Sequence, residues 1–428
     1  MIDLGHIPSW CLYPILEKME PEKIAEIAPV NKSLSETCLS QTLWEDKYNK
    51  KFNQLAYHIS KSPMNVDWLS SYARRHSVSF NIENHKPKAK SFKGTEINQI
   101  HSYSNSFAFS GKDNLSIFAY DYLENGCEYE TIKSIPIESN DFLYVDQNTI
   151  VTVADEVLSM INIKTGQISE ITKGIGRNPL MHAISPKMFA VVTESRGYIF
   201  DTDDITSPRS DFKHIGKPIA LGSNNYHLYI ATSKDLICIN VYNPRAPILW
   251  SFSVRDDANV TQCSFNYKAG IAIYGNQAIK LISGRNLFTF DEQNIITSAI
   301  LNNGIAVLGT MTEGVIYYDI NKKAKLGTQM FGEDEKIRFI YHNNLNDKVV
   351  IAGDFNVHIV APHYENDEFV ISEVRSPLKC GSVRMRMIEN FGILKQIIFD
   401  GERIIANMGD FVRVYDFYTG KLAEITPQ

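Results

Sequence analysis

A repeat with a period near 40 residues is the feature that most constrains the fold of this chain. From about Ile97 onward, eight segments each contain an apolar strand, a polar turn and a second strand rich in β-branched and aromatic residues. The second strands close at equivalent positions, which are Asp121, Asn162, Asp201, Asn240, Ser283, Asp319, Ala361 and Asp416. These positions lie 41, 39, 39, 43, 36, 42 and 55 residues apart. A period near 40 with four short strands per unit is typical of a β-propeller blade.

Further apolar strands complete these units upstream, beginning near Phe142, Leu180, Val260, Ile296, Ile337 and Leu394. Alternating segments such as YETIKSI and KLAEIT are suited to outer strands. We therefore expect eight blades, with seven as the alternative. Because the last spacing exceeds the others, residues Pro377 to Phe391 are expected to form an insertion or a long loop between blades.

The first forty residues have a different pattern, from Ile7 to Trp44. Leu12, Ile15, Leu16 and Met19 recur at the spacing of one helical face. Prolines at 21 and 29 indicate the start and the end of a second short helix, and a third helix is expected to run on into Trp44. Three short helices with this much apolar surface predict a partner that covers part of it.

Composition restricts the class of protein. The chain has 428 residues, of which 44% are hydrophobic and 21% charged, as in globular proteins. Its net charge of -6 offers no basic excess for nucleic acid. Its six cysteines form no CxxC pair, which favours reduced thiols in a cytoplasmic or nuclear protein. We expect neither a secretory signal nor a membrane span.

The N-terminal residues resemble the F-box family. The resemblance rests on Ile7-Pro8, Leu12, Ile15-Leu16, Val30 with Lys32, and Leu43-Trp44, and it covers about a tenth of the chain. The chain departs from the family pattern where Leu34 replaces a tryptophan and Asn31 a cysteine. The resemblance implies a three-helix module that docks on a Skp-type adaptor of cullin–RING (SCF) ubiquitin ligases. The alternative is a helical cap on the following domain.

The predicted domain boundaries follow from these patterns. Residues 1–46 are predicted to form the F-box, 47–95 a helical linker and 96–428 the propeller. The basic run from Lys86 to Lys93 is interpreted as a solvated connector, because it lacks interleaved aromatic residues. The fold class is thus α+β multidomain, with an N-terminal three-helix F-box and helical linker followed by an all-β propeller.

The propeller units also resemble degenerate WD repeats. Tyr120-Asp121, Phe200-Asp201, Tyr318-Asp319 and Tyr415-Asp416 occupy the place of the Trp-Asp dipeptide. The Gly-His signature of the family is absent from every unit, so the hydrogen-bonded network that it supports in WD repeats is not expected here. The blades should depend more on apolar packing between neighbouring sheets.

No catalytic motif stands out, and we expect no cofactor and no metal. His358 and His363 lack a third and a fourth ligand for zinc. Seven arginines fall near predicted loops, where a cluster could bind a phosphorylated peptide, although the sequence does not show that they converge. They are Arg177, Arg196, Arg209, Arg255, Arg285, Arg338 and Arg384.

The sequence therefore predicts a non-catalytic substrate-recognition subunit of an SCF E3 ubiquitin ligase. It would bind a Skp-type adaptor, and through it a cullin, while the propeller binds an unknown target protein. The expected adaptor-binding residues are Ile7, Pro8, Leu12, Ile15, Leu16, Ile24, Val30 and Trp44. The alternatives are an F-box scaffold or assembly factor outside ubiquitination, and a propeller enzyme whose helices form a cap.

Overall fold

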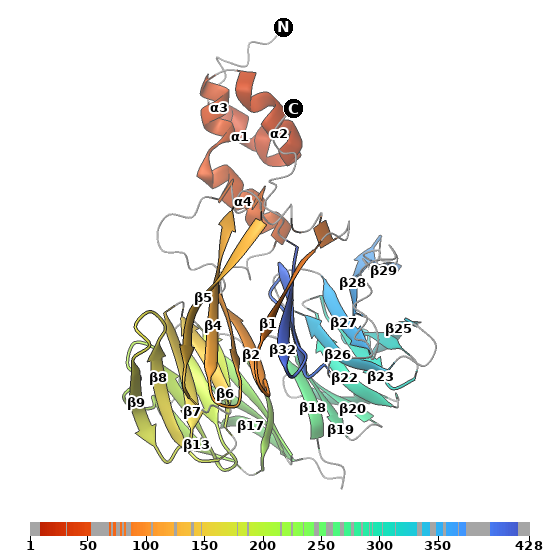
Figure 1. Ribbon diagram of the computed structural model, residues 1–428. Helices are drawn as coiled ribbons and strands as arrows, with labels where there is room; N and C mark the ends of the chain where they lie inside the picture. Colours follow the sequence, from red (N-terminus) through yellow and green to blue (C-terminus); the bar gives the residue numbers. More distant parts are fainter. Residues whose placement is uncertain are drawn as a thin grey trace.

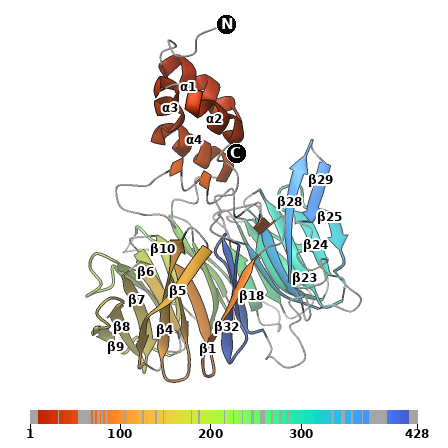
Figure 2. The same ribbon diagram turned by 45° about the horizontal axis from the view of Figure 1, so that its top comes forward.

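A computed structural model describes residues 9–30, 32–52 and 87–417, apart from 374–393 and short gaps in loops; between 52 and 87 it describes positions 68, 69, 72, 73, 78, 81 and 82. The chain forms two parts, a ring of β-sheets and a group of helices that stands over one face of the ring (Figure 1). Figure 2 shows the same separation from a tilted direction.

The helical module consists of α1 (Ser9–Lys18), α2 (Pro21–Ile27), a short 3-10 helix η2 (Ala28–Val30), α3 (Lys32–Cys38) and α4 (Gln41–Phe52). Pro21 begins α2, where a proline costs no hydrogen bond. The predicted third helix is two helices in the structure, because the chain leaves the helical conformation at Ser40 before α4 starts.

The first four blades are continuous in sequence. Blade 1 contains β2 (Gln99–Tyr103), β3 (Ser106–Ser110), β4 (Leu115–Leu123) and β5 (Gly126–Ile135). Blade 2 contains β6 (Asp141–Asp146), β7 (Thr149–Ala154), β8 (Val157–Asn162) and β9 (Ile168–Lys173). Blade 3 contains β10 (Leu180–Ser185), β11 (Met188–Val192), β12 (Arg196–Asp201) and β13 (Ser210–Lys213). Blade 4 contains β14 (Pro218–Ser223), β15 (His227–Thr232), β16 (Asp235–Asn240) and β17 (Ile248–Ser253).

The next three blades follow the same order. The last blade contains three strands from the end of the described chain and one strand, β1, that precedes blade 1 in the sequence. Blade 5 contains β18 (Val260–Phe265), β19 (Ala269–Tyr274), β20 (Ala278–Ser283) and β21 (Asn286–Phe290). Blade 6 contains β22 (Ile295–Ile300), β23 (Ile305–Thr310), β24 (Val315–Asp319) and β25 (Ala324–Gln329). Blade 7 contains β26 (Ile337–His342), β27 (Val349–Gly353), β28 (Val357–Glu365) and β29 (Glu368–Glu373). Blade 8 contains β30 (Gln396–Phe399), β31 (Arg403–Asn407), β32 (Phe411–Asp416) and β1 (Lys88–Lys93).

The described residues thus form eight four-stranded antiparallel sheets, which confirms eight blades rather than seven. Second strands such as β3, β23 and β31 are buried at every residue, because neighbouring blades cover both of their faces. Outer strands such as β9 alternate between exposed and partly buried residues.

The ring is closed by β1, which pairs antiparallel with β32 from Lys88 opposite Asp416 to Lys93 opposite Phe411. The interpretation of Lys86–Lys93 as a solvated connector is therefore wrong, and the predicted start of the propeller at residue 96 falls after its first strand. The segment KLAEIT, predicted as an outer strand, and the predicted insertion at 377–391 lie outside the described residues.

One apolar cluster fills each seam between neighbouring blades. In the seam between blades 8 and 1, Phe92 of β1 packs against Phe107, Phe118 and Tyr129, with ring centroids 5.1, 4.6 and 5.6 Å apart. Corresponding clusters occupy the other seven seams. Apolar side chains thus pack between every pair of neighbouring blades.

Polar side chains of the inner strands add hydrogen bonds across several seams. The side-chain amide of Gln396 in blade 8 accepts from the amide of Ile100 at 2.8 Å and donates to its carbonyl at 3.1 Å. In blade 2, Oδ2 of Asp141 accepts from the amide of Met181 in blade 3 at 2.9 Å. His182 Nε2 and Ser223 Oγ lie 2.9 Å apart between blades 3 and 4. These bonds fix the register of one blade against the next.

We predict that Phe92→Ala opens the ring. Loss of the buried phenyl group (8% exposed) should lower the free energy of unfolding by about 3–5 kcal/mol. The substitution leaves a cavity in the seam where the first and last strands of the propeller meet. Urea denaturation followed by tryptophan fluorescence measures the change. Lys93→Ala, one residue away on the exposed side of β1, is the control and should change stability by less than about 0.5 kcal/mol.

Asp141 should make stability depend on pH. Burial raises the pKa of this carboxyl from 3.8 to about 7, against the lowering effect of its hydrogen bonds. A raised pKa favours the folded state fully below pH 3.8, and this contribution is lost as the pH rises through 7. Asp141→Asn removes this titration, so the unmodified protein loses stability as the pH rises from 4 to 8 and the variant does not. The stability of the variant relative to the unmodified protein should therefore increase over this range. Urea denaturation at several pH values tests this, with Asp113→Asn as an exposed control; a constant difference would contradict it.

Candidate protein-interaction site

The helical module has a core of its own. Leu12, Leu16, Ile24 and Trp44 are between 1% and 3% exposed and pack with other apolar residues of the module. The indole Nε1 of Trp44 donates to the carbonyl of Cys38 at 2.7 Å. Among the described residues, this cluster contains side chains from the helices and from positions 68, 69 and 72, and none from the blades.

The predicted adaptor-binding residues therefore separate into groups. Leu12, Leu16, Ile24 and Trp44 shape the module from inside. Ile15 is 56% exposed on α1 and available to a partner. Ile7 and Pro8 lie outside the described residues, as does the side chain of Val30. The pattern i, i+3, i+4, i+7 identified an apolar face, but most of that face is internal.

One exposed apolar residue was missed by sequence reasoning. Leu39 follows α3 and is 51% exposed, although it continues the same apolar pattern as the buried Leu34 and Cys38. Its position just after the end of a helix, where the chain leaves the helical period, is the sequence signal that could have identified it. Ile15 and Leu39 are the exposed large apolar side chains among the described residues of the module.

The described helical positions between residues 52 and 87 contact both the module and the ring. At one end, the ring of Tyr72 lies 5.2 Å from that of Trp44, and the amide of Trp68 donates to Oε1 of Gln41 at 2.6 Å. Further along the chain, Val78 and Ile82 are 2% and 1% exposed. These two side chains are part of the apolar cluster that fills the seam between blades 7 and 8. The segment is thus anchored in both parts of the molecule.

The end of the last blade receives this segment. Nδ2 of Asn81 donates to the carbonyl of Phe417 at 2.8 Å, and the amide of Phe417 donates to the carbonyl of Glu402 at 3.1 Å. Phe417 is buried in the same seam as Val78 and Ile82. The joint therefore combines apolar packing with directional bonds, which fixes how the segment enters the ring.

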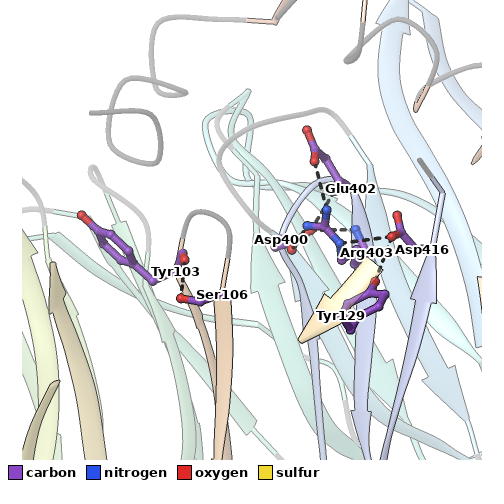
Figure 3. Close-up of polar contacts among 7 residues, drawn as sticks. All are labelled: Tyr103, Ser106, Tyr129, Asp400, Glu402, Arg403 and Asp416. Atoms are coloured by element: carbon purple, nitrogen blue, oxygen red, sulfur yellow. Dashed lines mark hydrogen bonds and ion pairs between the residues drawn. The ribbon is translucent and has the colours of Figure 1, made fainter. Parts of the chain in front are cut away.

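A buried charge cluster lies beside this joint (Figure 3). The guanidinium of Arg403, whose side chain is 1% exposed, lies 3.1 Å from Asp400, 3.6 Å from Glu402 and 3.5 Å from Asp416. It also stacks over the ring of Tyr120 in blade 1, 3.5 Å from the centroid.

The cluster extends across the closing seam. The hydroxyl of Tyr129, in blade 1, donates to Oδ2 of Asp416 at 2.8 Å. Burial raises the pKa of Asp400, and the positive charge of Arg403 partly offsets this effect. Arg403 was not among the arginines singled out from sequence, because a local sequence does not show that a charged residue is buried. The local signal is the pair of acids, Asp400 and Glu402, in the turn directly before it, whereas Asp416 lies at the end of β32.

Several other candidates from sequence make local contacts in the described part of the chain. His363 Nδ1 lies 2.9 Å from the carbonyl of Ala361, and His358 packs against Phe331. Across the described residues, no group of three or more His, Cys, Asp or Glu side chains could hold a metal ion. Arg177 and Arg209 form ion pairs with Glu156 and Asp201. Arg255, Arg285 and Arg384 lie outside the described residues.

Comparisons with known proteins support the fold alone. No protein-family model matches the chain, and no curated protein matches it. The crystal structure of the computationally designed Ika8 protein is 13% identical with a TM-score of 0.55, covering 76% of this chain and 98% of its own. The C-terminal WD40 domain of Sif2 is 14% identical with a TM-score of 0.48, covering 62% of this chain and 81% of its own. A chain of the mitotic checkpoint complex is 11% identical with a TM-score of 0.47, covering 63% of this chain and 84% of its own.

The chain is therefore a β-propeller protein that carries a helical module over one face of its ring. Eight four-stranded sheets and the closing strand define this fold in the described residues. None of the helices in the described part of the chain has the length and apolarity needed to cross a lipid bilayer. Cys11, Cys38, Cys238 and Cys263 are free thiols.

We predict that Arg403→Leu is strongly destabilising. It leaves three buried or nearly buried carboxylates without their cation, which should cost about 3–5 kcal/mol in the free energy of unfolding. Arg177→Ala removes an exposed ion pair with Glu156 and should cost less than about 1 kcal/mol. Equal effects of the two substitutions in urea denaturation would show that the cluster does not hold the closing blade.

Proposed function

We propose that this protein is the substrate-recognition subunit of an SCF-type E3 ubiquitin ligase. A Skp-type adaptor, and through it a cullin, binds the helical module, and the propeller binds a target protein. The observation that carries the proposal is the separate core of the module, which leaves Ile15 and Leu39 exposed and belongs to a sequence that resembles the F-box.

The division of the predicted docking residues agrees with this function. A module that docks on a partner needs an internal core to hold its shape, which Leu12, Leu16, Ile24 and Trp44 supply. It also needs exposed apolar side chains that the partner covers, and Ile15 is suited to that role. Ile7, Pro8 and Val30 remain predicted contacts. The described residues of the module expose two large apolar side chains, Ile15 and Leu39, so backbone and polar contacts would contribute a share of the adaptor binding.

The anchored joint supports a tethering function without catalysis. Tethering accelerates a reaction by raising the effective concentration of one reactant near another. A connection that is fixed at Trp44 and Tyr72 on one side, and at Val78 and Ile82 on the other, keeps this effective concentration high. The protein would hold its target beside a conjugating enzyme in the cytoplasm or nucleus, and it would contribute no catalytic residue.

The double substitution Ile15→Asp, Leu39→Asp tests the docking surface. Both side chains are exposed, so the fold should be retained while burial of two carboxylates weakens adaptor binding by at least tenfold. Isothermal titration with a Skp-type adaptor measures the affinity, and circular dichroism checks the fold. Met330→Asp, which changes a propeller side chain that is 56% exposed, is the matched control and should bind normally.

Unchanged adaptor binding by the double variant would contradict the docking surface. Native purification distinguishes the ligase from the scaffold alternative, because a scaffold outside ubiquitination would recover the adaptor without a cullin. Recovery of neither partner by the unmodified protein would contradict both.

A further inference from the structure

Exposed apolar side chains are concentrated on blade 4. Nine large hydrophobic side chains are classed as exposed among the described residues, and two of them belong to the helical module. Of the seven on the ring, four lie on blade 4: Tyr226, Tyr242, Ile248 and Leu249, with exposures of 66%, 49%, 42% and 43%. We call these four residues the blade 4 patch. Such clustering among the described side chains of the ring marks an interaction surface.

The aromatic half of the patch is an organised structure. The rings of Tyr226 and Tyr242 lie 6.1 Å apart, and the guanidinium of Arg209 from blade 3 lies 5.4 Å from the ring of Tyr242. The amide of Val241 donates to the carbonyl of Tyr226 at 3.1 Å, which ties the two turns together. Tyrosine and arginine are the residue types that most often carry binding energy in protein interfaces.

The apolar half of the patch begins the outer strand β17. This strand lies at the edge of its sheet, and no further described strand pairs with its outer side. Its sequence, ILWSFS, contains no charged residue. The outer strands of six other blades carry at least one Lys, Asp or Glu, a feature that discourages pairing with a foreign strand. The remaining outer strand, β21, is also uncharged, but its described side chain Phe290 is buried.

A bulge presents two consecutive apolar side chains at this edge. Ile248 pairs with Ile239 and Trp250 with Cys238, so Leu249 has no residue opposite it in β16. In a regular strand, successive side chains point to opposite faces of the sheet. The bulge changes this alternation, and both Ile248 and Leu249 are exposed.

We propose that β17 and the blade 4 patch bind an extended segment of the target protein by strand addition. The segment would pair with the outer edge of β17 and place apolar or aromatic side chains against Ile248, Leu249, Tyr226 and Tyr242. The row of backbone donors and acceptors along an edge strand pairs with an extended chain, and neither a helix nor a lipid satisfies it. This inference rests on the proposed function, because it assigns the surface that recognises the target.

A second copy of the chain is a poorer occupant of the same edge. The rim of a ring is convex, so two rings would touch along little more than the six residues of β17, about 20 Å. Stable interfaces bury roughly 1,200 Å² or more. A peptide segment can instead follow the edge and continue onto the tyrosines.

Selection of displayed random twelve-residue peptides against the full chain tests the proposal. Enriched peptides are synthesised with a fluorescent label, and their affinities are measured by anisotropy. We expect at least tenfold weaker binding to Leu249→Lys, because a lysine at the edge opposes pairing. The control Met330→Lys, an exposed apolar side chain on another blade, should bind the peptides unchanged.

N-methylation of each peptide amide in turn then tests strand addition itself. Because alternate amides of an added strand face the receptor edge, we expect at least tenfold losses at every second position and small effects between them. The proposal is overturned if no enriched peptide depends on Leu249, if the losses do not alternate, or if the unmodified protein is a dimer that Leu249→Lys dissociates.

Adaptor binding, measured in parallel, separates the two proposals. Leu249→Lys should leave adaptor affinity and the melting temperature unchanged, because the residue is exposed and belongs to the propeller. Loss of peptide binding with normal adaptor binding supports the blade 4 patch. Loss of adaptor binding by Ile15→Asp, Leu39→Asp with unchanged peptide binding shows that the two surfaces act separately.

Discussion

The pairing of β1 with β32 is the interaction on which the rest of the structure depends. A ring of sheets has no free edge between its blades only when its first and last parts meet, and here they meet within one sheet. Phe92 links that sheet to blade 1, where it contacts three aromatic rings. Every other seam can form between blades that are neighbours in sequence, whereas this seam requires both ends of the domain.

The joint with the helical module lies beside the same closure. Val78 and Ile82 fill the seam between blades 7 and 8, and Arg403 with its carboxylates lies between blades 8 and 1. An apolar cluster tolerates several arrangements, but a buried cation with three anions is satisfied in few of them. The apolar cluster thus anchors Val78 and Ile82 in the ring, and the charge cluster holds blade 8 against blade 1.

The period near 40 residues predicted the number of blades because each unit carries its own turns and apolar strands. The closing strand could not be found in this way, since β1 has one buried residue, Phe92, among three lysines. Those lysines are the signal that was misread: charge on an edge strand prevents unwanted pairing, and it also conceals the strand from a search for alternation.

For the candidate site, too, the sequence predicted only part of what the structure shows. Helical spacing found the apolar residues Leu12, Ile15 and Leu16, but spacing alone cannot tell a face that packs internally from a face that binds a partner. Burial decides that Leu16 is internal and Ile15 exposed. The Arg403 cluster joins side chains from blades 8 and 1, so no single stretch of sequence contains it. The blade 4 patch lies within residues 226–249, but the sequence there does not show which apolar side chains are exposed.

The position of β1 has a consequence for synthesis of the protein. Asn81 and its hydrogen-bonding partner Phe417 are 336 residues apart in the sequence. The paired strands β1 and β32 are separated by a similar length of chain. At ribosomal rates of about 5–20 residues per second, the nascent β1 waits roughly 15–70 s for its partner. During that time the nascent chain exposes the Phe92 side chain and an unpaired strand edge, and chaperones bind exposed features of this kind. Cellular yield of this protein should therefore depend on protection of the emerging first strand as well as on the stability of the finished ring.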